Sequence, residues 1–135
     1  MNKLKILCLI LIVLSVTSIS YFPTIENDFI NWDDDKYVIK NELIKELTIK
    51  NIKEIFATSF VSIYTPIAVL SYAVEHKIFG LNPHAYHATN LIFHSLNSIL
   101  VFCLFLILSG NKIISFFVSI FFAIHPMHVE SVAWI

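Results

Sequence analysis

The chain has 135 residues, of which 57% are hydrophobic and only 14% charged, and its mean hydropathy is +0.76. Soluble domains carry about a quarter charged residues, so this composition excludes an ordinary soluble domain and indicates an integral membrane protein. The net charge of −1 gives no reason to expect a nucleic-acid partner.

An apolar run from about residue 6 to residue 22 follows Lys3 and Lys5. At about 1.5 Å per residue, the run nearly crosses a hydrocarbon core of about 30 Å. Lysines ahead of such a run place the N-terminus in the cytoplasm. We therefore expect a first transmembrane helix within residues 1–23. The alternative is a cleaved signal peptide, although Ser18 to Ser20 would make a poor cleavage site.

Most of the charged residues fall in residues 24–82, which predicts an extracytoplasmic loop. The loop contains the acidic stretch Asn31-Trp32-Asp33-Asp34-Asp35. Neighbouring carboxylates raise one another's pKa unless water, a cation or a substrate proton offsets their charge. This stretch is therefore a candidate general base. The alternative is a solvated loop or the N-cap of a short helix.

Two amphipathic helices are predicted within this loop. The first runs from Thr48, a plausible N-cap, to about Ala57. The second begins at Thr65-Pro66 by the same signals and ends at Gly80. One face of this helix, apolar except for Ser71, carries Ile67, Leu70, Ser71, Val74 and Ile78. We expect this second helix to lie on the membrane surface; the alternative is an ordinary packed helix of a small loop domain.

A second transmembrane helix is predicted over residues 83–109, between Asn82-Pro83 and Gly110. Its first half carries polar residues spaced by three or four, which fall on one face: His87, Asn90, His94 and Asn97. Polar side chains are costly against lipid, so the stripe should face protein or a water-filled cavity. It is either the wall of a substrate cavity or a set of interhelical hydrogen bonds.

A third transmembrane helix with an outer His/Glu motif is expected within residues 113–135. It begins with the apolar, Phe-rich run from Ile113 to Ile124 and is closed by the motif His125-Pro126-Met127-His128-Val129-Glu130. Three crossings from a cytoplasmic N-terminus leave Lys112 inside. They bring the acidic stretch, the polar end of the second helix and the His/Glu motif to the same outer surface. This convergence predicts a site facing the membrane, where a carboxylate could activate a hydroxyl against a lipid-linked donor.

A divalent cation is the alternative occupant of this surface. Asp33, Asp34, Glu130 and the histidines are competent ligands. However, His125 and His128 flank a proline and lack the i, i+4 spacing of a zinc protease pair. We therefore assign no metal ligand and keep a divalent cation only as a possible cofactor.

The pattern Phe29-x-x-Trp32-Asp33-Asp34 after a first transmembrane helix resembles the opening of the GT-C membrane glycosyltransferases. Later stretches are similar to one subgroup, the membrane proteins with tetratricopeptide repeats that include eukaryotic protein O-mannosyltransferases. These stretches are Tyr64-Thr65-Pro66, Leu70-Ser71-Tyr72, Phe79-Gly80-Leu81-Asn82-Pro83, Tyr86-His87-x-x-Asn90, His94 and His125-Pro126-x-His128-x-Glu130-x-Val132-Ala133.

The resemblance implies an all-α membrane protein with a partial GT-C bundle of about three transmembrane helices and a large first loop. It implies transfer of a sugar from a polyprenyl-phosphate donor to a protein hydroxyl or glycan on the extracytoplasmic side. Asp33 would be the general base and Asp34 the paired acid. The residues expected to contact substrates are Tyr64, Pro66, His87, Asn90, His94, His125, His128 and Glu130.

The chain departs from that subgroup in two respects. Asp35 makes a triple acid, which leaves open which carboxylate is the base. Members of the subgroup also carry many more helices, and the present sequence contains no tetratricopeptide signature. We therefore expect an N-terminal fragment of a multi-pass transferase of the bacterial inner membrane or an equivalent membrane. The alternative is a noncatalytic truncated membrane protein or a subunit of a larger assembly.

Overall fold

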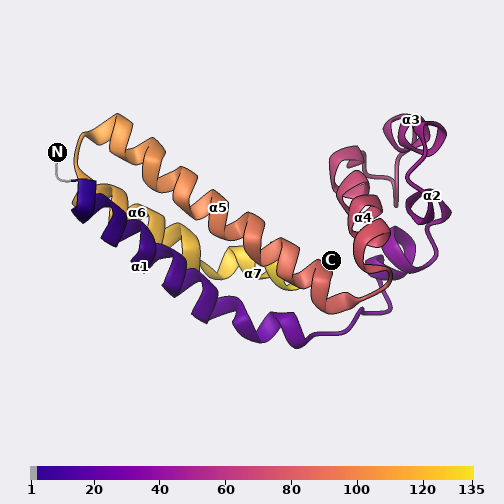
Figure 1. Cartoon of the computed structure of the whole chain (residues 1–135), viewed down its shortest axis with the longest axis horizontal. Helices are drawn as coiled ribbons and strands as arrows, with labels where there is room; N and C mark the ends of the chain where they lie inside the picture. Colours follow the sequence, from indigo (N-terminus) through magenta and orange to yellow (C-terminus); the bar gives the residue numbers. More distant parts are fainter. Residues whose placement is uncertain (1–2) are drawn as a thin grey trace. The chain divides into compact units, whose positions relative to one another are not determined.

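The computed structural model describes residues 3–135, and its regular elements in that range are helices (Figure 1). They form two units. Unit 1 comprises residues 3–26 and 87–134, and unit 2 comprises residues 27–86 together with Ile135. The expected all-α fold class is confirmed.

Unit 1 is built from long apolar helices. Its helices are α1 (Lys3–Tyr21), the 3₁₀ helix η1 (Phe22–Glu26), most of α5 (Pro83–Ser109), α6 (Lys112–Ile124), the 3₁₀ helix η3 (Pro126–His128) and α7 (Val129–Ala133). The segment Lys3–Glu26 and helix α5 are each long and apolar enough to cross a membrane. A third span exists if α6 and the segment Pro126–Ala133, which are bent by 50° relative to each other, are counted as one.

Helices α1 and α6 lie side by side because small residues line their contact (Figure 1). Ser115, Ser119 and Ala123 recur every four residues on α6 and are fully buried, as are Val13 and Thr17 on α1. Small side chains let the backbones of membrane helices approach closely. The hydroxyl groups are satisfied within their own helices, for example by the 2.8 Å bond from Thr17 Oγ1 to the Val13 carbonyl oxygen.

The bend after α6 follows from Pro126. A proline disfavours the helical conformation in the residue before it, and His125 accordingly has φ −65° and ψ 129°. The helix therefore ends at Ile124, and its 13 residues span only about 20 Å. The apolar run predicted to begin the third transmembrane helix, residues 113–124, thus corresponds to α6, and the His/Glu motif forms the bent segment that follows it.

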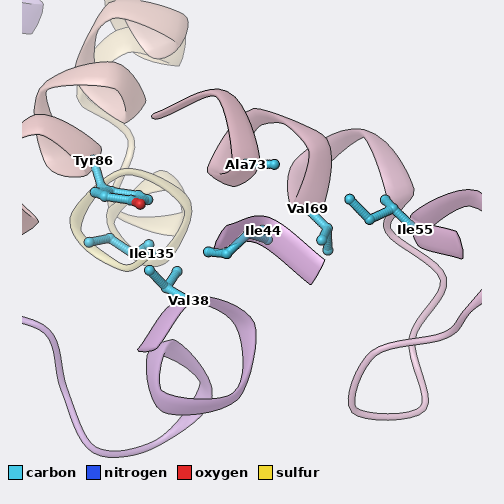
Figure 2. Close-up of a cluster of buried hydrophobic side chains, with 7 residues drawn as sticks. All are labelled: Val38, Ile44, Ile55, Val69, Ala73, Tyr86 and Ile135. Carbon is cyan, nitrogen blue, oxygen red and sulfur yellow. The ribbon is translucent and has the colours of Figure 1, made fainter. Parts of the chain in front are cut away.

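Unit 2 contains the π-helix η2 (Asp35–Ile39), α2 (Glu42–Lys45), α3 (Ile49–Ala57) and α4 (Pro66–Phe79). Each of these elements contributes to one apolar core. Figure 2 shows the buried side chains of this core, which point toward one another: Val38, Ile44, Ile55, Val69, Ala73, Tyr86 and Ile135. Because α4 packs on η2, α2 and α3, it is the central helix of the unit.

The predicted helix boundaries are largely confirmed by their caps. Thr48 Oγ1 accepts a hydrogen bond from Asn51 N at 3.1 Å, which caps α3. Gly80 adopts φ +64° and ends α4, a conformation in which glycine avoids Cβ strain. Thr65 occupies the predicted N-cap position and Pro66 the first helical position of α4, but the Thr65 side chain makes no capping hydrogen bond.

Helix α4 buries a different face from its predicted apolar stripe. Val69 and Ala73 are fully buried, whereas Ile67 is 76% exposed and Ile78 64% exposed. This packing agrees with the alternative of a packed helix in a small loop domain. The other face of α4 carries the exposed apolar residues. That this face lies on the membrane surface stays a prediction.

Candidate functional site

Asp34 anchors the loop that precedes η2. Its side chain is buried, with 1% relative exposure, and its Oδ2 accepts a hydrogen bond from Ile30 N at 2.9 Å. A turn closed by Trp32 N and the Ile30 carbonyl oxygen, at 2.8 Å, lies within the same loop. A buried carboxylate is costly unless amide groups donate to it. Asp34 therefore fixes the conformation of the acidic stretch.

The two neighbouring carboxylates have different surroundings. Asp35 forms an ion pair with Lys40. Asp33 is partly exposed and makes no hydrogen bond or ion pair with another residue in the part of the chain that the structure describes. Of the three consecutive acids, Asp33 is consequently the one whose carboxylate is available to a ligand.

A second buried carboxylate, Glu75 on α4, belongs to the same unit. Its side chain is only 6% exposed. Burial, together with the negative charges of Glu75 and Asp34, raises the pKa of Tyr72 to about 12. Both carboxylates are thus close enough to Tyr72 to disfavour its anion. Glu75 lies outside the residues that the sequence patterns single out, because a charged residue in an amphipathic helix is expected to face water.

Tyr64 and Pro66 lie at the entry to α4 in the same unit. The Tyr64 hydroxyl donates to the Phe56 carbonyl oxygen at 2.9 Å, at the end of α3, while 59% of the residue stays exposed. Pro66 is the first residue of α4. Tyr64 therefore ties α3 to the start of α4 and still presents surface to a ligand.

In unit 1, the polar stripe of α5 is used for hydrogen bonds to backbone carbonyl groups. Asn90 Nδ2 donates to the Trp134 carbonyl oxygen at 2.7 Å. His94 Nε2 lies 2.9 Å from the Ala123 carbonyl oxygen. Because a carbonyl only accepts, His94 Nε2 must carry a hydrogen. Of the two expectations for the stripe, these contacts correspond to interhelical hydrogen bonding.

The Ala123 carbonyl needs this partner because α6 is interrupted. In a continuous helix Met127 N would donate to it, but Met127 N donates instead to His125 Nδ1 at 3.2 Å. Carbonyl groups at a helix end require outside donors when they are buried. His94 therefore supplies the hydrogen bond that the Ala123 carbonyl loses at the bend before Pro126.

Three of the predicted histidines lie together. The ring centroid of His128 is 5.5 Å from that of His94 and 6.1 Å from that of His125. Phe122 stacks on His94 at 5.5 Å, and Tyr21 meets the same ring edge-on at 5.1 Å. His94 is buried, whereas His125 is exposed and His128 partly exposed.

The remaining predicted residues of unit 1 divide between buried and exposed positions. His87 is buried at 1% exposure, and Glu130 is exposed on α7. Asn97, expected in the α5 stripe, is exposed. Ser98 is buried in its place and donates to the His94 carbonyl oxygen at 2.9 Å. The expected meeting of the acidic stretch, in unit 2, with the His/Glu motif, in unit 1, stays a prediction.

A metal centre finds no support among the described residues. Within residues 3–135, no three His, Cys, Asp or Glu side chains are grouped so that they could hold an ion. No ligand set can therefore be assigned to the divalent cation that the sequence left as a possible cofactor.

Comparison with known proteins gives relatives of one kind. The chain is 39% identical over 72 residues to protein O-mannosyl-transferase TMTC2 of Homo sapiens, a match covering 53% of this chain and 9% of that protein. It is 36% identical over 73 residues to protein O-mannosyl-transferase TMTC1 of Mus musculus, covering 53% and 8% respectively. The resemblance is to protein O-mannosyl-transferases.

A longer match extends the same resemblance. Protein O-mannosyl-transferase F38B6.6 of Caenorhabditis elegans is 25% identical over 140 aligned positions, which cover 92% of this chain and 19% of that protein. No protein-family model matches the chain, and no solved structure does. The resemblance predicted from the sequence motifs is confirmed. In these matches the chain spans less than a fifth of the length of its curated relatives.

Proposed function

We propose that this chain supplies the N-terminal membrane helices and the acidic loop of a membrane glycosyltransferase. The enzyme transfers a sugar from a polyprenyl-phosphate donor to a hydroxyl group of a protein or glycan on the extracytoplasmic side. The observation that carries the proposal is the similarity to relatives that are named protein O-mannosyl-transferases. The two membrane-spanning segments support a lipid-linked donor.

In this proposal Asp33 is the general base. The acceptor hydroxyl oxygen attacks the anomeric carbon of the donor sugar, and its proton passes to the Asp33 carboxylate. The bond between the anomeric carbon and the phosphate oxygen breaks, and polyprenyl phosphate leaves with the electron pair. The partial exposure of Asp33 supports this role, because a base must reach the proton that it removes.

Asp34 and Glu75 have supporting roles. Asp34 holds the loop through Ile30 N and so keeps Asp33 in position. Glu75 adds negative charge near Tyr72, and this charge disfavours a further anion nearby. Because Asp34 holds the loop that carries Asp33, it acts as a positioning residue. Asp34 is also the paired acid of the motif.

The substrate contacts are assigned to the exposed part of the motif residues. His125, His128 and Glu130 are accessible on the bent segment after α6 and suit hydrogen bonds to sugar or phosphate oxygens. Tyr64 offers its exposed ring near the start of α4, beside Pro66. Asn90 and His94 hold this bent segment from α5, and His87 is buried on the same helix. The N-terminus lies in the cytoplasm, as the leading lysines favour.

The experiment uses membranes containing the complete transferase that includes this chain, with polyprenyl-phosphate [³H]mannose as the donor. Asp33→Asn should lower the initial rate of transfer by about 100-fold or more, since a general base contributes about 10²–10⁴-fold. Asp35→Asn is the matched control, because it removes a neighbouring carboxylate that is already paired with Lys40. It should retain most of the activity.

Two outcomes would contradict the proposal. A wild-type protein that inserts into the membrane and transfers no sugar would favour a noncatalytic subunit. An Asp33→Asn protein with the wild-type rate would remove Asp33 from its role and leave the transferase assignment in place.

A further inference from the structure

A groove of about 410 Å³ lies between the start of α1 and the start of α6 in unit 1. It is lined by Leu4, Lys5, Cys8, Leu9, Lys112 and Ile113. Apart from the two lysine ammonium groups, these side chains are apolar. Figure 1 shows the beginnings of the two helices beside each other at this end of the unit. The surface of the groove is therefore almost entirely hydrocarbon, and Lys5 and Lys112, from different helices, line it with their aliphatic chains. Such chains let the ammonium groups extend from the apolar surface toward the polar interface.

The charges of unit 1 are separated along its helices. Its lysines are Lys3, Lys5 and Lys112, at the starts of α1 and α6. Its carboxylates are Glu26 and Glu130, which lie beyond the other ends of these helices. Within residues 3–135, neither Lys5 nor Lys112 forms an ion pair. The positive charge at this end is consequently uncompensated by the described protein.

The position along the helices places the groove at a membrane surface. Helix α1 has 19 residues and is about 28 Å long, close to the thickness of a hydrocarbon core. The lysine end and the carboxylate end thus lie near opposite membrane surfaces. Lysines favour the cytoplasmic side, where anionic lipids are concentrated.

Lys112 also borders a second hollow on its other side. This hollow, of about 440 Å³, is lined by Leu106, Ser109, Gly110, Asn111 and Lys112 at the turn between α5 and α6. Its hydroxyl and amide groups suit a hydrated headgroup. Lys112 therefore lies between an apolar groove and a polar surface. A lysine at a bilayer interface has such surroundings, with its aliphatic chain against hydrocarbon and its ammonium group in the polar layer.

We propose that the groove between α1 and α6 binds an anionic phospholipid of the leaflet that faces the N-terminus. Lys5 and Lys112 bind its phosphate, and one acyl chain lies along Leu4, Leu9 and Ile113. An anionic phospholipid supplies the missing negative charge through its phosphodiester group. The same molecule supplies an acyl chain for the apolar surface of the groove. Another apolar helix in the groove would bury two lysines without a carboxylate, which is costly. This proposal is independent of the transferase function.

The test measures lipid retention by native mass spectrometry of the purified chain, delipidated and then exposed to phosphatidylglycerol or phosphatidylcholine. We expect retention of phosphatidylglycerol to exceed that of phosphatidylcholine. Lys5→Gln and Lys112→Gln should each weaken phosphatidylglycerol binding about 5-fold, and the double variant about 25-fold. Lys3→Gln is the matched control, because Lys3 carries the same charge on the same helix outside the groove lining. It should change binding by less than about 2-fold.

Cys8 provides a second readout inside the groove. Cys8 lines it, and the other cysteine, Cys103, lies exposed on α5. In the Cys103→Ser protein, phosphatidylglycerol should slow the reaction of Cys8 with N-ethylmaleimide more than phosphatidylcholine does. In the Cys8→Ser protein, the two lipids should protect Cys103 equally. Circular dichroism verifies that each variant retains its helices.

The proposal would be overturned by equal retention of the two lipids in the wild-type chain. Unchanged phosphatidylglycerol binding in the double lysine variant would overturn it as well. Cys8 that is unreactive to the same extent in both lipids would indicate that a protein segment fills the groove, and this result would also contradict it.

Discussion

Asn90 and His94, one turn apart on α5, hold the two ends of the bent segment that follows α6. Asn90 donates to the Trp134 carbonyl oxygen at 2.7 Å, and His94 donates to the Ala123 carbonyl oxygen at 2.9 Å. The residues of the His/Glu motif lie between these two carbonyl groups in the sequence. The position of His125, His128 and Glu130 therefore depends on two side chains of another helix.

Removing the Asn90 amide should destabilise unit 1. We expect Asn90→Leu to lower the free energy of unfolding by about 1–2 kcal/mol, because the Trp134 carbonyl loses its donor. Unfolding of the purified chain in detergent by heat or denaturant measures this change. Asn97→Leu, an exposed position on the same helix, is the control and should have little effect. If Asn90→Leu and Asn97→Leu had the same free energy of unfolding, the Asn90 hydrogen bond would contribute nothing to stability.

The contact between α1 and α6 should not tolerate a larger side chain at Ser119. The residue is fully buried, and its hydroxyl is bonded to the Phe116 carbonyl oxygen at 2.9 Å. Ser119→Leu should cost about 1–3 kcal/mol of stability, since overpacking forces the helices apart. Ser18→Leu, at an exposed position on α1, should be neutral in the same unfolding measurement. A stable Ser119→Leu protein would contradict the close approach of the helices.

The tight turn between α3 and α4 contains an unfavourable backbone conformation. Val61 has φ +47° and Ser62 φ +65°, and the turn is closed by a 2.7 Å bond from Ile63 N to the Phe60 carbonyl oxygen. A β-branched residue is strained at positive φ. Val61→Gly should therefore stabilise unit 2 by about 1 kcal/mol, whereas Val129→Gly, in α7, should destabilise unit 1 by a similar amount. A loss of stability on Val61→Gly would count against the positive φ.

Tyr72 should ionise only at high pH. Its pKa is raised to about 12, first by burial and then by the charges of Glu75 and Asp34. In the unfolded chain a tyrosine ionises near about pH 10. Between these values the unfolded state binds fewer protons than the folded state, so stability falls as pH rises through this window. Stability should not depend on Tyr72 ionisation at lower pH.

Ultraviolet absorbance of tyrosinate measures this titration. Tyr72→Phe should remove a step with a midpoint near pH 12, and Glu75→Gln should move the step to lower pH. Asp28→Asn, which removes a carboxylate that is not among the causes of the shift, should leave it unchanged. A midpoint that does not respond to Glu75→Gln would separate Glu75 from Tyr72.

Sequence patterns predicted the elements whose ends carry strong local signals. Pro83 and Gly110 delimit α5 as expected, and Thr48 caps α3. The short elements η2 and α2 escaped prediction because four or five residues show no helical period. Their formation depends on packing of Val38 and Ile44 in the core of unit 2.

One member of the predicted polar stripe on α5 was wrong, because Asn97 is exposed and Ser98 is buried instead. Asn97 and Ser98 are adjacent and both polar, so periodicity alone does not decide which one is buried. Ser98 can be buried cheaply because its hydroxyl bonds to its own helix at His94. The burial of Glu75 was unpredicted for a related reason, since only tertiary packing of α4 decides which face is covered.

The most direct test of the transferase account is the single-turnover rate of mannose transfer by the complete protein with Asp33→Asn, at a donor concentration that saturates the wild type. The account predicts a rate reduced at least about 100-fold with undiminished donor binding. A single-turnover rate equal to that of the wild type would contradict it.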